Sequence, residues 1–135
     1  MTLPQSAINK VIEVLPKAVT PDIIYLFGSF ANGTTHPKSD IDIAYLSNST
    51  ITPYERFSLA QKLASSLNRD VDLIDLNAAS TVFQSQIISN GQPIYCVNDV
   101  RKAEFEMLVL KKYAKLNEER KIILNRIEES GQIYE

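Results

Sequence analysis

The sequence has few of the residues on which disulfide-bonded, histidine-metal and membrane-spanning proteins depend. Its 135 residues include one cysteine, Cys96, so no disulfide can form within the chain. One histidine, His36, defines no metal site by itself. No apolar run approaches the roughly 20 residues of a membrane-spanning helix, and the N-terminal stretch is too polar for a secretory signal. We therefore expect a cytoplasmic protein without a membrane partner.

An excess of positive charge is also missing. Lys and Arg number 14 against 16 Asp and Glu, which gives a formal net charge of -2. Sequence-independent binding of DNA or RNA needs clustered basic side chains that neutralise phosphates. The composition therefore argues against stable nucleic-acid binding, and the length fits one domain with a modest core.

The apolar pattern predicts helices that alternate with short strands. Helices are expected over residues 4–15, 53–67, 77–89 and 99–129, and strands over 23–27, 40–45, 70–76 and 93–97. Pro16 should end or kink the first helix, and residues 30–35 should form a short helix or turn. The second long helix begins with a capping box at Thr52 and Glu55 and should bury Phe57, Ala60, Leu63, Ala64 and Leu67. The proline in 93–97 places that strand near an edge.

The last predicted helix is too long for the domain that carries it. At about 1.5 Å per residue it would extend roughly 45 Å. Its apolar stripe consists of Val109, Tyr113, Leu116, Ile123 and Ile127. We divide the chain into a core of residues 1–98 and a C-terminal helix of residues 99–135, whose stripe favours contact with a partner over packing within the domain.

The most informative pattern is Gly28-Ser29, then ten residues, then Asp40-Ile41-Asp42. Asp40 and Asp42 are two apart on a predicted strand, so their side chains share one face. Two such close negative charges are costly unless a cation lies between them. Mg²⁺ prefers oxygen ligands and is often shared between carboxylates and substrate phosphates. The pair is therefore a candidate metal site.

A third carboxylate is expected from the strand Asp70-Val71-Asp72-Leu73-Ile74-Asp75. Asp72 lies nearest its middle and is flanked by apolar residues, so it is our choice, with Asp70 and Asp75 as alternatives. Asp72 would act as a metal ligand, or as a general base for an incoming hydroxyl.

Gly28 and Ser29 follow a buried strand and suit a triphosphate. The missing Cβ of Gly28 lets a phosphate approach the backbone, and backbone N–H groups at a following helix start can hold it together with the Ser29 hydroxyl. Lys38 could add positive charge in the loop before the carboxylates. A Gly-Ser turn or an Asp-x-Asp strand alone is usually structural, but their combination with a third acidic strand favours function.

The segment GSFANGTTHPKSDIDIAYL resembles the signature of the polymerase-β-like nucleotidyltransferase superfamily, and the resemblance covers about residues 5–97. The short chain and its VDLIDL strand resemble the minimal nucleotidyltransferase (MNT) branch. The long last helix resembles the MNT antitoxins of HEPN–MNT toxin–antitoxin pairs. The resemblance implies an α/β (α+β) fold, with a small mixed β-sheet, helices packed on one face and a long C-terminal helix.

The resemblance also implies a chemistry. Such antitoxins use ATP and Mg²⁺ to transfer AMP onto a tyrosine of a HEPN ribonuclease toxin, with which they form a hetero-oligomeric complex. Asp40, Asp42 and Asp72 would bind metal, and Gly28, Ser29 and Lys38 would hold the triphosphate. Two alternatives stay open: a nucleotidyltransferase for a small-molecule acceptor, and an antitoxin that masks its partner without catalysis.

Overall fold

The computed structural model describes residues 4–28 and 40–134, with side chains up to Glu129. The short helix or turn expected over 30–35 lies outside these residues. The described elements, in chain order, are α1 (Gln5–Val19), β1 (Ile23–Phe27), β2 (Ile41–Leu46), α3 (Pro53–Leu67), β3 (Val71–Asp75), the 3-10 turn η1 (Leu76–Ala78), α4 (Thr81–Asn90), β4 (Gln92–Cys96) and α5 (Asp99–Tyr134).

The four strands form one mixed sheet in the order β3-β2-β1-β4. β1 is antiparallel to β2 and to β4, whereas β2 and β3 are parallel. β4 lies at one edge, as its proline predicts, and β3 lies at the other. The two central strands are almost fully buried, because their apolar runs have to fill the space on both sides of the sheet.

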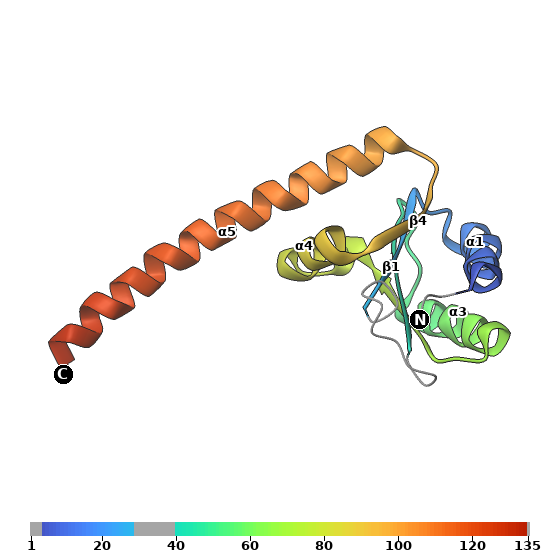
Figure 1. Ribbon diagram of the computed structural model, residues 1–135, viewed down its shortest axis with the longest axis horizontal. Coiled ribbons are helices and arrows are strands. Elements are labelled where there is room, and N and C mark those ends of the chain that lie inside the picture. Colours follow the sequence, from blue (N-terminus) through green and yellow to red (C-terminus); the bar gives the residue numbers. More distant parts are fainter. Residues whose placement is uncertain (1–3, 29–39, 135) are drawn as a thin grey trace.

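Helices cover both faces of this sheet. α1 and α3 pack on one face with Ile24, Leu26 and Ile43, whereas α4 and the start of α5 pack on the other with Ile23 and Tyr25 (Figure 1). The expected fold class is confirmed, but the expectation that helices pack on one face is wrong. Successive residues of β1 point to opposite sides and all of them are apolar, so both faces have to be covered.

α1 continues through Pro16 to Val19, so the expected end at residue 15 is wrong. Proline removes one helical hydrogen bond, but Leu15 and Val19 are both fully buried and their packing holds the last turn. The helix ends at Thr20, whose φ of 41° lies in the left-handed region.

The predicted capping box of α3 is confirmed. The Glu55 N–H donates to the Thr52 hydroxyl at 3.1 Å, and the Thr52 N–H donates to the Glu55 carboxylate at 3.3 Å. Phe57, however, is not part of the core: it is 61% exposed and Leu59 is buried instead. Apolar residues occur on two overlapping stripes of this helix, and periodicity alone did not choose between them.

The region after β3 is divided where one helix was expected. The turn η1 comes first, and α4 then begins after Ser80, whose hydroxyl accepts a hydrogen bond from the Phe83 N–H at 3.2 Å. A serine in this position is a strong N-cap, so it starts a new helix.

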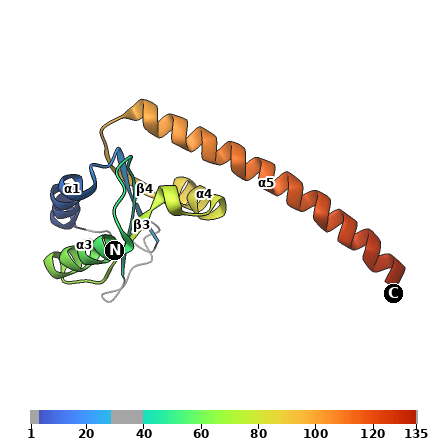
Figure 2. The ribbon, with the colours of Figure 1, turned by 180° about the vertical axis from the view of Figure 1, so that it is seen from behind.

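α5 begins on the sheet and then leaves the domain. Its first turns bury Phe105 and Val109, and the Tyr25 hydroxyl donates to the Glu106 carboxylate at 2.8 Å. The helix then extends away as an arm, which two opposite views show (Figures 1 and 2). Ile123 and Ile127 on this arm are 54% and 60% exposed. Within the described residues, no helix is both long and apolar enough to cross a membrane.

Candidate active site

Asp42 lies at the centre of the candidate site because strand alternation turns it away from α1 and α3. Its neighbours Ile41 and Ile43 are fully buried on the α1–α3 side of β2. Asp42 therefore faces the opposite side of the sheet, where it is half-buried. Two core residues fix the backbone on either side of it, so the direction of the carboxylate is well defined.

Asp72 lies beside Asp42 on the neighbouring strand. β2 and β3 pair in parallel with Asp42 opposite Asp72, and strands in such a pair lie about 4.8 Å apart. Asp40, which directly precedes β2, is exposed. Burial, followed by the negative charges of Asp72 and then Asp40, raises the pKa of Asp42 to about 6.

The two alternatives for the third carboxylate do not pair with Asp42. Asp75 accepts a hydrogen bond from the Asn77 N–H at 3.0 Å and thereby caps η1. Asp70 precedes β3, and its backbone carbonyl accepts from the Ile41 N–H at 2.9 Å. Of the three candidates, Asp72 is the one that pairs with Asp42. Its role as ligand or base stays a prediction.

Gly28 closes the other side of Asp42. It follows β1, whose last residue Phe27 pairs with Asp42, and its φ of +72° is one that side chains rarely allow. A Cβ added there would lie 2.1 Å from the Asp42 Oδ2. The backbone therefore approaches the carboxylate as closely as only glycine permits. Ser29 and Lys38, the other expected triphosphate ligands, lie outside the described residues.

These residues suit Mg²⁺ in the presence of a nucleotide. Among residues 4–28 and 40–134, no three histidine, cysteine or acidic side chains are close enough to hold a metal ion by themselves. Mg²⁺, however, is commonly bound by one or two carboxylates together with substrate phosphates. The crowded charges on Asp42 and Asp72 are what a divalent cation would relieve, so the donor set fits.

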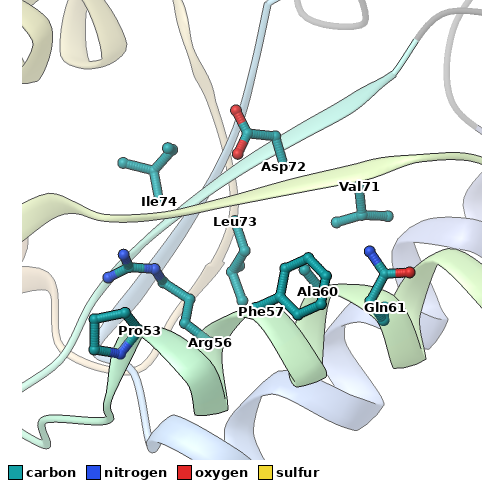
Figure 3. Close-up of a pocket in the computed structure, with 9 residues that line it drawn as sticks. All are labelled: Pro53, Arg56, Phe57, Ala60, Gln61, Val71, Asp72, Leu73 and Ile74. Carbon is teal, nitrogen blue, oxygen red and sulfur yellow. The ribbon is translucent and has the colours of Figure 1, made fainter.

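A cavity beside β3 was not predicted from the sequence. A space of about 440 Å³ lies between α3 and β3 and is bordered by Arg56, Phe57, Leu73 and Asp72 (Figure 3). In the close-up Leu73 points toward α3, whereas the Asp72 carboxylate points to the other side of β3.

The fold and the paired carboxylates define a nucleotidyltransferase-type domain, and comparison with known proteins agrees. The family model described as polymerase beta, nucleotidyltransferase, matches residues 9–100. Protein adenylyltransferase MntA of Shewanella oneidensis is 40% identical over 120 residues, which make up 88% of this chain and 86% of that protein.

Solved structures extend the similarity to the whole fold. A crystal structure of a toxin–antitoxin with AMP-PNP has a chain with 40% identity and a TM-score of 0.80, over 89% of this chain and 97% of that one. A structure of a tri-AMPylated S. oneidensis HEPN toxin in complex with an MNT antitoxin has a chain with 36% identity and a TM-score of 0.77, over 91% and 97%. The chain belongs to the polymerase beta nucleotidyltransferase family and, within it, to the MntA-like minimal nucleotidyltransferases.

Proposed function

We propose that this chain is the antitoxin of a HEPN–MNT pair and silences its partner, a HEPN-type ribonuclease, by transferring AMP from ATP onto a tyrosine. The S. oneidensis relative is a protein adenylyltransferase, and similar chains occur in structures with AMP-PNP and with a tri-AMPylated toxin. The observation in this chain that supports the proposal is the Asp42–Asp72 pair beside Gly28. The antitoxin and its toxin would act in the cytoplasm.

In this proposal, Asp40, Asp42 and Asp72 hold Mg²⁺. The ion, when bound, supplies positive charge that stabilises the attacking and leaving oxygens of an in-line displacement. Asp42 is aimed by the buried residues on either side of it. Asp72 is the more exposed of the paired carboxylates, so it can instead accept the proton of the incoming hydroxyl, which is the role of a general base.

The triphosphate would lie against the turn that follows β1. Gly28 brings the backbone close to Asp42, so phosphate oxygens held there lie next to the carboxylates. We assign Ser29 and Lys38 to the same task, Ser29 through its hydroxyl and backbone N–H and Lys38 through its charge.

The C-terminal helix would bind the toxin. Beyond Leu116, every described side chain of α5 is exposed, including those of Ile122, Ile123, Leu124 and Ile127. Apolar side chains in this number on a protruding helix are typical of a protein interface. The division into a catalytic core of residues 1–98 and a partner-binding helix of residues 99–135 rests on this exposure.

The proposal is tested by incubating the chain with ATP, Mg²⁺ and the HEPN-type product of the adjacent reading frame. Intact mass spectrometry should show gains of the mass of AMP on the partner and none without Mg²⁺. The double variant Asp40→Asn, Asp42→Asn should abolish this gain while leaving the complex intact. If the double variant still neutralises the toxin, the chain acts by masking and not by transfer.

A small-molecule acceptor is the alternative that the same experiment separates. Sites for small molecules are usually concave and enclose most of the ligand, whereas the Asp72 carboxylate is exposed on an edge strand and points away from the cavity between α3 and β3 (Figure 3). An open surface of this kind favours a macromolecular acceptor. Labelling of an aminoglycoside-type compound in place of the partner would reverse this conclusion.

A further inference from the structure

The outer edge of β3 carries backbone groups that face away from the sheet. In a parallel pair, alternate residues of a strand direct both backbone groups to the same neighbour. The hydrogen bond from the Ile41 N–H to the Asp70 carbonyl sets this alternation. The backbone groups of Asp72 and Ile74 therefore face β2, and those of Val71 and Leu73 face outward. In the part of the chain that the structure describes, no strand lies on that side.

A trough runs along this edge. The cavity of about 440 Å³ between α3 and β3 is followed by one of about 370 Å³. Arg56 and Ile74 border both cavities, so the two adjoin. The trough extends from Val71 past Ile74 to Ala79, so all of β3 borders it.

We propose that the edge of β3 is the docking site of the acceptor: an extended segment of the protein partner pairs with Val71 and Leu73 and presents its tyrosine beside Asp72. This inference rests on the proposed function, whose acceptor it places. Side chains of an added strand would alternate between the α3 side, where the trough receives them, and the side that carries Asp72. Neighbouring strands lie about 4.8 Å apart, so a tyrosine on the second side reaches the carboxylates.

The lining favours a peptide over a nucleic acid. Among the residues that border the two cavities, Arg56 is the one basic side chain, and Asp72 and Asp75 are acidic. A phosphate backbone would be repelled by the two carboxylates. Phe57, 61% exposed at the mouth of the trough, offers an apolar surface to a side chain of the docked segment (Figure 3).

Amide hydrogen exchange tests the docking directly. Exchange at Val71 and Leu73 should slow at least about tenfold when the HEPN-type product of the adjacent reading frame is added, because a paired N–H is protected. The amides of Asp72 and Ile74 already bond to β2 and should change little, so they are internal controls. Unchanged exchange at Val71 and Leu73 would overturn the proposal, as would protection of both in the free chain.

A pair of aromatic substitutions gives a second readout. Phe57→Glu should raise the KM for the partner about tenfold with little change in ATP affinity, since it removes an apolar contact from the trough. Tyr54→Glu is the matched control, because Tyr54 is an even more exposed aromatic on α3 that does not border the trough. Equal effects of the two substitutions would count against docking at this edge.

The two proposals fail in different ways. AMP transfer without protection at Val71 and Leu73 would overturn the docking and leave the proposed function standing. Protection without any AMP transfer would support the docking and contradict the proposed function.

Discussion

At the scale of single residues, Asp42 should make the stability of the chain depend on pH. Its pKa is raised from 3.8 to about 6 by burial, by Asp72 and by Asp40. The folded state therefore binds the proton more tightly than the unfolded state, and stability falls as pH rises from about 4 through 6. Without metal, Asp42→Asn should raise the free energy of unfolding at pH 7.5 by about 1 kcal/mol, a value that allows for solvent screening of the partly exposed carboxylate.

Urea unfolding in EDTA at pH 4 and pH 7.5 measures this difference. At pH 4 the effect should be much smaller than at pH 7.5, because the wild-type carboxyl is then protonated in the folded state and partly protonated in the unfolded state. Asp75→Ala is a suitable comparison: it removes the oxygen that accepts from the Asn77 N–H at the start of η1, so it should destabilise the chain at pH 7.5. A loss of stability in Asp42→Asn at pH 7.5 would show that the surroundings favour the ionised carboxylate, which would contradict the raised pKa of Asp42.

Gly28 is a second residue whose substitution has a definite outcome. Gly28→Ala should abolish AMP transfer and lower the free energy of unfolding by about 1–2 kcal/mol, because it forces a Cβ against Asp42 at a positive φ. Binding of AMP-PNP, measured by calorimetry, should also be lost in this variant.

Gly91→Ala provides the matched control. An added Cβ there would lie 2.4 Å from the Ile87 backbone carbonyl oxygen and 3.4 Å from that of Leu26, and Asp42 is not among its nearest neighbours. That variant should also be destabilised, yet it should still bind AMP-PNP at temperatures where it is folded. If both variants lose binding equally, the loss in Gly28→Ala reflects folding and not the site.

At the scale of helices and strands, the sequence predicted most elements because their apolar periods are clear. The strand over 23–27, the capping box of α3 and the edge position of β4 all follow from local patterns that the structure confirms. Helix ends were predicted less well. Pro16 has a strong local preference against the helix interior, but the burial of Val19 outweighs it.

The pairing of the site residues could not be read from local patterns. Alternation placed Asp40 and Asp42 on one face, but the choice of Asp72 over Asp70 and Asp75 depends on the register between β2 and β3, which is a tertiary property. The trough along β3 was missed for a related reason. Periodicity placed Phe57 in the core, and its exposure depends on how α3 is rotated against the sheet.

At the scale of the whole molecule, the chain combines a packed sheet with a helical arm whose described side chains beyond Leu116 are all exposed. Both faces of the sheet are covered by helices, and the two central strands supply nine of the 20 buried apolar residues in the described part of the chain. By contrast, residues 117–129 of α5 are all exposed. The core and the arm should therefore differ in their free energy of unfolding. The core is stabilised by its own packing, whereas the apolar residues of the arm become buried only when a partner covers them.

This division predicts that the arm is only marginally stable until the partner binds. Isolated helices are marginal in water, and packing supplies most helix stability in proteins. In the free chain, amides of residues 117–129 should exchange almost as fast as in an unfolded peptide, while those of β1 and β2 stay protected. In the complex with the HEPN-type partner, exchange on the arm should slow at least about tenfold.

The variant Ile123→Asp, Ile127→Asp should remove that protection without lowering the melting temperature of the core, since neither side chain contributes to it. Arg120→Ala on the same arm should leave the protection in place. Strong protection of the arm in the free chain at low concentration would mean that its helix does not need a partner, and partner binding would then have to be sought elsewhere on the molecule.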